Sequence, residues 1–229
     1  MSNQHIFQEM DLSMNNLKEK VHLMASLTCQ NIEHAIQALL TQDIDLARMV
    51  IGDDSDVDEL EVKIDQMGLD ILIRFHPMAS DLRAVITSMK TAHNLERISD
   101  HAVNIAKRAK KICKSPSPID ASEIEPLSKM ADQILSDALR AYKDADHELG
   151  EGLHAADKEL DAAYKQVSAS LSSRLENSGT NAENILHLIL VARSIERIGD
   201  LAVNIGEDSV FLSKARDIRH EQRRIQDGK

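Results

Sequence analysis

The chain has 229 residues, of which 42% are hydrophobic and 2% aromatic, and its formal net charge is -11 at pH 7. This length is enough for one large domain or two small ones, whereas the negative charge argues against a nucleic-acid binder and against a protein lying on anionic lipid, because both need a positive field. The two cysteines lack a paired spacing, which argues against a disulfide framework or thiolate metal site and fits a cytoplasmic protein.

Strong helix formers dominate the composition, whereas Gly occurs 8 times and Pro 4 times. No segment alternates polar and apolar residues with the period of a strand. The start of the chain lacks the basic and apolar segments of a signal peptide, and no apolar run is long enough to span a bilayer. We therefore expect an all-α protein without direct membrane insertion.

Apolar residues at helical spacing predict three helices in the first half of the chain. The expected ranges are about 9–41 with a short extension near 46–51, the residues from the acidic cluster GDDSD at 52–56 to about 75, and 80 to about 112. The cluster offers Asp and Ser side chains as N-caps, and Ser80 is the predicted N-cap of the third helix. His76-Pro77 should end the second helix, since the residue before a proline avoids helical geometry.

The second half repeats this series, with helices expected at about 121–147, about 155–177 and after a stop at Ser178-Gly179. Thr180 followed by Glu183 has the pattern of a capping box for the last helix. The segment KSPSPID at 114–120 holds two of the four prolines and marks the junction. We expect residues 1–115 and 116–229 to form two domains, each an antiparallel three-helix bundle.

An internal repeat supports this division. Residues 59–106 align with 159–206 without a gap, and about a quarter of the aligned positions are identical. The longest match pairs ERISDHAVNI, which begins at Glu96, with ERIGDLAVNI, which begins at Glu196. The predicted fold class is therefore all-α, with two tandem three-helix bundles related by the repeat.

The acidic residues of these strings continue a row that is apolar upstream. Glu96 and Asp100 follow Met89 by seven and eleven positions, and residues so spaced on a helix lie within roughly 20° of each other. An adjoining face carries a second apolar stripe, which consists of Leu95, Ile98, Ala102, Ile105 and Ala109. The carboxylates should therefore lie beside packed surfaces.

Two carboxylates at this spacing repel each other by roughly 0.2–0.5 kcal/mol even when exposed, and partial burial makes the repulsion worse. A bound cation relieves both penalties, and carboxylate oxygens suit hard cations such as Mg, Mn, Ca or Fe. The preceding helices offer acids at the same spacing. The candidate metal ligands are therefore Glu61 with Asp65, Glu96 with Asp100, Asp157 with Asp161, and Glu196 with Asp200.

Other interpretations of these acids stay open. An acidic pair on a helix is often a solvated face, and Arg97 and Arg197 could neutralise the acids as ion pairs. The two candidate sites also differ, because Asp65 has Lys165 at its matching position. His93 matches an arginine in the repeat, which favours a structural or surface role for this histidine.

The runs HPMASDLRAVITSMKTAHNLERISD, from 76 to 100, and ARSIERIGDLAVNI, from 192 to 205, resemble the PhoU family of accessory regulators of bacterial phosphate uptake and signalling. The resemblance extends over nearly the whole chain. It implies two three-helix bundles, a homodimer, and E/D-x-x-x-D motifs that hold metal clusters of Fe, Mn, Mg or Zn. By motif, these fall on the eight acids named above. Ser99 replaces the family's usual glycine, which puts a helix contact or the space for the cation in doubt.

The resemblance also implies a non-enzymatic function at the cytoplasmic face. Proteins of this kind contact the ATPase subunit of the phosphate transporter and a sensor histidine kinase, and they repress the phosphate-starvation response when phosphate is ample. No nucleophile with a neighbouring base and no glycine-rich phosphate loop is visible in the sequence, so neither catalysis nor nucleotide binding is predicted.

Two alternatives remain. The first is a carboxylate-bridged di-iron bundle, which needs Glu-x-x-His pairs facing inward from two helices; the chain has Glu19 with His22 and Glu151 with His154, but these occupy different parts of the repeat. The second is an interaction adaptor whose acidic surface docks basic partners and whose metals are incidental.

Overall fold

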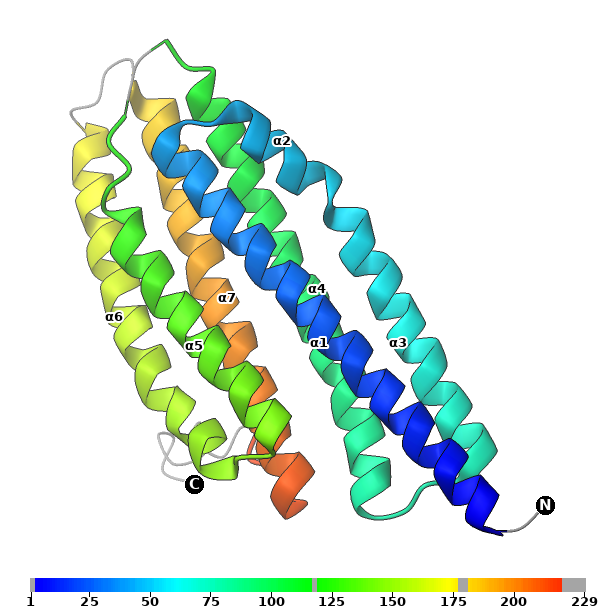
Figure 1. Ribbon diagram of the computed structural model, residues 1–229. Helices are drawn as coiled ribbons and strands as arrows, with labels where there is room; N and C mark the ends of the chain where they lie inside the picture. Colours follow the sequence, from blue (N-terminus) through cyan, green and yellow to red (C-terminus); the bar gives the residue numbers. More distant parts are fainter. Residues whose placement is uncertain (1–2, 117–118, 177–180, 220–229) are drawn as a thin grey trace.

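The computed structural model describes residues 3–116, 119–176 and 181–219. Within these ranges the chain forms helices and no strand (Figure 1), which confirms the predicted all-α class. The helices are α1 (Asn3–Thr41), α2 (Ile44–Gly52), α3 (Asp54–Phe75), α4 (Ser80–Cys113), α5 (Ile124–Asp144), α6 (His147–Glu176) and α7 (Ala182–Lys214). None of the described helices combines the length and apolarity needed to cross a membrane.

The predicted extension after the first helix is the separate short helix α2. Asp43 is its N-cap, and the Asp43 carboxylate accepts hydrogen bonds from the backbone N–H groups of Asp45 and Leu46. Gln42 precedes it with a φ of 55°, so the chain turns sharply between α1 and α2. An Asx-type cap at a positive-φ turn thus starts a new helix where the apolar pattern alone suggested a continuation.

Several helix ends differ from the predictions. Ala79, with a φ of 50°, is the N-cap of α4 in place of Ser80, and Asp53 caps α3 without a side-chain hydrogen bond. The helix α6 begins at His147, eight residues earlier than expected, because Gly150 and Gly152 do not interrupt it. The proposed cap Thr180 and the stop at 178–179 lie outside the described residues.

The centre of the molecule is the pair α4 and α7, which pack together and run antiparallel in Figure 1. The helices α1 and α5 lie in front of this pair in the same view, and α3 and α6 form the two outer edges. Each outer helix packs on one central helix, α3 on α4 and α6 on α7. This arrangement places the acidic motifs of α3 opposite those of α4, and the motifs of α6 opposite those of α7.

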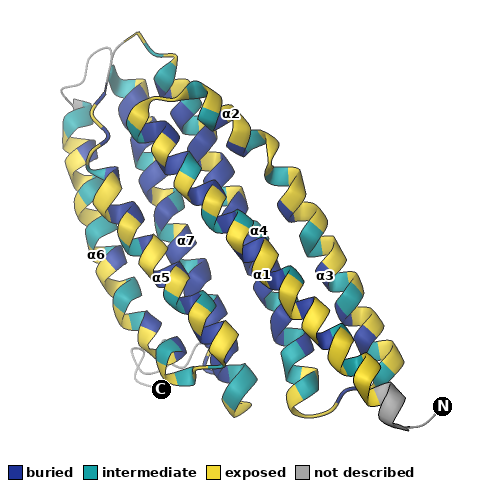
Figure 2. Cartoon of the chain, in the orientation of Figure 1, coloured by how far each residue is buried: buried dark blue, intermediate teal, exposed yellow. Residues whose placement is uncertain are grey.

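One continuous hydrophobic core runs through both halves, and buried residues face inward along every long helix (Figure 2). The predicted stripe of α4 is fully buried, with 0% exposure at Leu95, Ile98, Ala102, Ile105 and Ala109. Because α4 of the first repeat packs on α7 of the second, the two bundles share one interior. The domain division at 115/116 stays a prediction.

Candidate metal centres

The outer helix α3 presents four acidic residues on one row, at successive spacings of four, three and four positions. These residues are Asp54, Asp58, Glu61 and Asp65. The row faces Glu96 and Asp100 of α4: burial raises the pKa of Glu96, and the nearby charges of Asp100, Glu61 and Asp58 raise it further. The structure therefore brings the two predicted acidic pairs of the first half into one electrostatic cluster.

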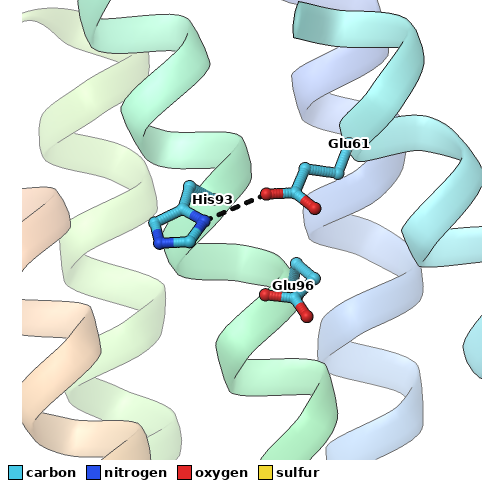
Figure 3. Close-up of side chains that lie close together, drawn as sticks. All are labelled: Glu61, His93 and Glu96. Atoms are coloured by element: carbon cyan, nitrogen blue, oxygen red, sulfur yellow. Dashed lines mark hydrogen bonds and ion pairs between the residues drawn. The ribbon is translucent and has the colours of Figure 1, made fainter.

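The closest grouping in this cluster consists of Glu61, His93 and Glu96. Each offers one ligand atom, and these atoms all lie within 4.8 Å of one another. His93 Nδ1 lies 3.0 Å from Glu61 Oε1, across the gap between α4 and α3 (Figure 3). Carboxylate oxygens and an imidazole nitrogen at this separation are a donor set that suits a divalent transition metal.

His93 was not among the ligands predicted from the sequence. Its match to Arg193 in the repeat favoured a structural or surface role, yet the structure places it beside Glu61. A local signal was available, because His93 precedes Glu96 by three positions and residues so spaced share a helix face. The repeat comparison did not indicate this proximity, whereas the exposed side chain of His93 agrees with the predicted surface role.

Two cationic groups offset the acids of the first centre only in part: Lys107 acts on Asp54, and the imidazole of His93 acts on Asp65 and Glu96. Burial raises the pKa of Asp65, the charge of Glu61 raises it further, and His93 partly offsets these effects. Burial likewise raises the pKa of Asp58, with added repulsion from Asp100 and Glu61. A positive ion at this point would reverse these penalties, because it favours the ionised form of every carboxylate around it.

The second centre lies between α6 and α7 and is formed by Asp157, Asp161, Glu196 and Asp200. Burial, together with the charges of Asp200 and Asp161, raises the pKa of Asp157 to about 6. Burial also raises the pKa of Glu196, again with repulsion from Asp200. The four predicted residues thus interact electrostatically, but within the described ranges no three of them bring ligand atoms within 4.8 Å of one another.

Arg197 supplies a countercharge in the second centre. Its Nη1 donates to Asp200 Oδ2 at 2.7 Å, and its Nε lies 3.4 Å from Glu196 Oε2. The alternative that arginine neutralises these acids is therefore confirmed for Arg197. Arg97, at the matching position, forms no ion pair within the part of the chain that the structure describes.

The second centre is extended by a pair that sequence analysis did not identify. His154 Nε2 lies 3.4 Å from Oε1 of the buried Glu207, and both charges influence the pKa of Asp157. In the repeat, His154 matches Asp54 and Glu207 matches Lys107, which interacts with Asp54. In the second half the basic partner is therefore on the outer helix and the acidic partner on the central helix, whereas in the first half the positions are exchanged.

The described residues do not form the ligand arrangement that a carboxylate-bridged di-iron site would need. Among the described residues, no group of three or more potential ligands includes Glu19, His22, Glu151 or His154. Glu151 instead lies 3.7 Å from Arg216, and His154 faces Glu207. Inward-facing Glu-x-x-His pairs converging on one point are therefore not formed by these strings.

Ser99 is accommodated in the packed interior of the first half. It is 1% exposed, and its Oγ accepts a hydrogen bond of 3.1 Å from Asn31 Nδ2 of α1. At the matching Gly199, an added Cβ would instead meet Leu160 of α6. The serine that stands in place of the family's glycine is therefore accommodated by a hydrogen bond to α1.

Comparison with known proteins agrees with the fold and the motifs. The family model of the PhoU domain matches residues 21–109 and 124–209. The phosphate-specific transport system accessory protein PhoU of Serratia marcescens is 34% identical over 95% of this chain and 90% of its own length, and that of Escherichia coli K12 is 33% identical with the same coverage.

Two crystal structures extend the likeness to three dimensions. PhoU from Pseudomonas aeruginosa has a TM-score of 0.86 at 30% identity, covering 90% of this chain and 99% of that one. The PhoU regulatory protein from Streptococcus pneumoniae has a TM-score of 0.84 at 23% identity, covering 91% and 98%, and shares the fold. Twin acidic motifs, the repeated helical domain and these likenesses together show that the chain belongs to the PhoU family.

Proposed function

We propose that the chain is a non-enzymatic regulator of phosphate uptake and of the phosphate-starvation response. Its relatives are named as accessory proteins of the phosphate-specific transport system, and they match over more than nine-tenths of this chain. The protein acts in the cytoplasm as a homodimer on the transporter's ATPase subunit and on a sensor histidine kinase. It represses the starvation response when phosphate is ample.

The regulator works as a metal-binding adaptor. The observation that carries this proposal is the convergence of Glu61, His93 and Glu96 from two adjacent helices. They lie beside an acidic row whose charge is only partly offset by neighbouring cations. The eight predicted acids hold cations at both centres, and His93 adds a nitrogen donor that favours Fe, Mn or Zn over Mg in the first. Such cations link each outer helix to the central pair and fix the surfaces that partners meet.

The experiment separates metal binding from regulation. Metal content of the purified protein is measured by plasma mass spectrometry for the wild type and for the double variant Glu61→Gln/Glu96→Gln. Partner binding is measured with the purified ATPase subunit and kinase, and regulation with a phosphatase reporter in a deletion strain grown in ample phosphate. We expect the variant to lose metal, to bind both partners more weakly and to leave the reporter derepressed.

The matched control is Glu59→Gln/Glu159→Gln, which also removes two acids; these are exposed residues of the outer helices α3 and α6 and lie outside the acidic rows. It should retain metal, partner binding and repression. A chain that fails to restore repression in the deletion strain although it is produced and folded would contradict the regulatory proposal. Full metal content in the Glu61/Glu96 variant would contradict the metal site.

A second candidate function is an adaptor in which metal serves stability alone. Three large apolar side chains of α3, Val62, Leu69 and Ile73, are 55%, 51% and 70% exposed. Their spacing of seven and four positions places them on one face, which is suited to a protein partner. Loss of metal with unchanged partner binding and repression would favour this candidate.

A further inference from the structure

A cavity of about 500 Å³ lies where helices of the two halves meet, and none of the candidate metal ligands lines it. Its wall includes Met14 of α1, Ser88 of α4, Tyr142 of α5 and Leu212 of α7. This volume falls within the range of small-molecule sites, which are commonly found between the helices of bundles. The cavity therefore has the size and position of a ligand site that joins both repeats.

Three exposed nitrogen-bearing side chains line the cavity, Lys18 and His22 of α1 and Lys143 of α5. The chain carries 38 acidic and 27 basic residues, so a lysine that faces a cavity would ordinarily find a carboxylate. Yet neither lysine forms an ion pair with another residue in the described parts of the chain. Two ammonium groups that have no carboxylate partner among the described residues thus line one cavity of an acidic protein.

Two acidic residues, Asp11 and Asp81, also line the cavity. Asp11 precedes Lys18 by seven positions, which separates them by about 10 Å along the axis of α1, and Asp81 belongs to the first turn of α4. The pKa of His22 is lowered by burial and by the charges of Lys143 and Lys18, and no carboxylate contributes to this shift. The field around His22 is therefore positive.

The buried wall beside these groups is fixed by hydrogen bonds. The hydroxyl oxygens of Ser88 and Tyr142 are 2.7 Å apart, and the Ser88 hydroxyl donates to Ala84 O, so Tyr142 donates to Ser88. The His22 ring stands edge-on to the Tyr142 ring, with centroids 6.2 Å apart. This fixed wall limits the positions that an anion could take beside the exposed ammonium groups, which form charge-assisted hydrogen bonds.

We propose that Lys18, His22 and Lys143 form a binding site for a small tetrahedral oxyanion, inorganic phosphate in this protein. The two ammonium groups donate charge-assisted hydrogen bonds, and a ring N–H of the neutral imidazole donates a third. Oxyanion binding follows from the geometry, whereas the choice of phosphate rests on the proposed function. Because α1 belongs to the first repeat and α5 to the second, the bound anion holds the two halves together.

The test is calorimetric titration of the metal-free full chain, kept in a chelator, with inorganic phosphate against a chloride titration of equal ionic strength. We expect binding to the wild type and at least a tenfold weaker affinity for Lys18→Gln/Lys143→Gln. The control Lys63→Gln/Lys114→Gln makes the same change of net charge at exposed sites away from the cavity and should bind as the wild type does. Absence of phosphate binding to the wild type, or equal affinity in the cavity variant, would overturn the proposal.

Thermal unfolding provides a second readout. Phosphate should raise the melting temperature of the wild type and of the control variant, but not that of the cavity variant, because a ligand stabilises only the state that binds it. A rise of equal size in the cavity variant would also refute the site. Metal content is measured on separate samples of the wild type and the cavity variant purified without chelator, and its retention in the cavity variant shows that failure of the oxyanion site is separate from failure of the metal-dependent function.

Discussion

The acidic centre between α3 and α4 and the one between α6 and α7 occupy matching positions of the repeat, yet they differ in how their charge is compensated. In the first, an imidazole lies 3.0 Å from Glu61 and no arginine pairs with the acids in the described structure. In the second, Arg197 contacts both acids of α7, and Asp157 is buried deeply enough to raise its pKa to about 6. Shared motifs therefore do not imply equal cation affinity, since that depends on neighbours outside the motif.

The largest expected effect concerns the ligands of the first centre. In Glu61→Gln/Glu96→Gln, the affinity of this centre for Mn²⁺ should fall by at least about a hundredfold, because changes to residues that only support a ligand already cost about 10–100-fold. Titration calorimetry of metal-free protein measures the change. The double variant Asp161→Asn/Glu196→Gln changes the matching positions of the second centre, which we expect to bind Mn²⁺ more weakly. It should lower the metal affinity of the second centre only. Loss of the tighter set in that variant would reverse the assignment.

The next largest effect concerns the packing of α6 on α7 in the second half. An added Cβ at Gly150 of α6 would lie 2.6 Å from the backbone oxygen of Gly206 in α7, so the backbone would have to move. Gly150→Ala should lower the free energy of unfolding by about 2 kcal/mol, measured in urea. Gly152→Ala, two residues away with nothing within 4 Å of the added Cβ, should raise it by about 0.5–1 kcal/mol. Similar changes in both variants would contradict a close approach of α6 and α7.

The metal-free protein should lose stability as the pH rises from about 4 to 7. The folded pKa of Asp157 is about 6 and its ordinary value is 3.8, so between these values the folded state binds more protons than the unfolded state. In Asp157→Asn, the loss of unfolding free energy between these pH values should be smaller by about 1 kcal/mol. This value allows for screening by solvent, because Asp157 is partly exposed. Urea unfolding at several pH values measures it. Asp58→Asn in the first half should have a smaller effect, and an unchanged profile in Asp157→Asn would contradict the assignment.

The smallest expected effect separates the two arginines. Arg197→Gln removes the cation that competes with metal in the second centre, and the affinity for Mn²⁺ there should rise about two- to fivefold, since exposed ion pairs contribute ~0.2–1 kcal/mol. Arg97→Gln should change the first centre less, because Arg97 forms no ion pair in the described structure. Calorimetry on both variants tests this, and equal changes would remove the proposed difference between the centres.

Much of the fold was accessible from sequence because it depends on local patterns. The stripe from Leu95 to Ala109 has helical spacing, and its members are fully buried as predicted. The end of α3 was also predicted, since the proline constrains His76 directly. The start of α6 was not, because Gly150 reads as a helix breaker, whereas in the fold it allows the close approach to Gly206.

The candidate site was likewise predictable only where it depends on spacing within a single helix. The acidic pairs were identified because a spacing of four residues sets a common face within one helix. His93 and Glu207 were missed because each acquires its role from a residue on another helix, Glu61 for the first and His154 for the second. Repeat symmetry gave no help at these positions, since the corresponding residues are an arginine and a lysine.

By itself, the sequence determined the helical class, the internal repeat and the acidic rows, since each follows from spacing along a single helix. Tertiary structure alone decided which charges meet. The packing of α3 on α4 brings His93 to Glu61, and the meeting of α1 and α5 brings Lys18 and Lys143 to one cavity. Electrostatic interaction depends on distance and burial in space, and neither is encoded by separation along the chain.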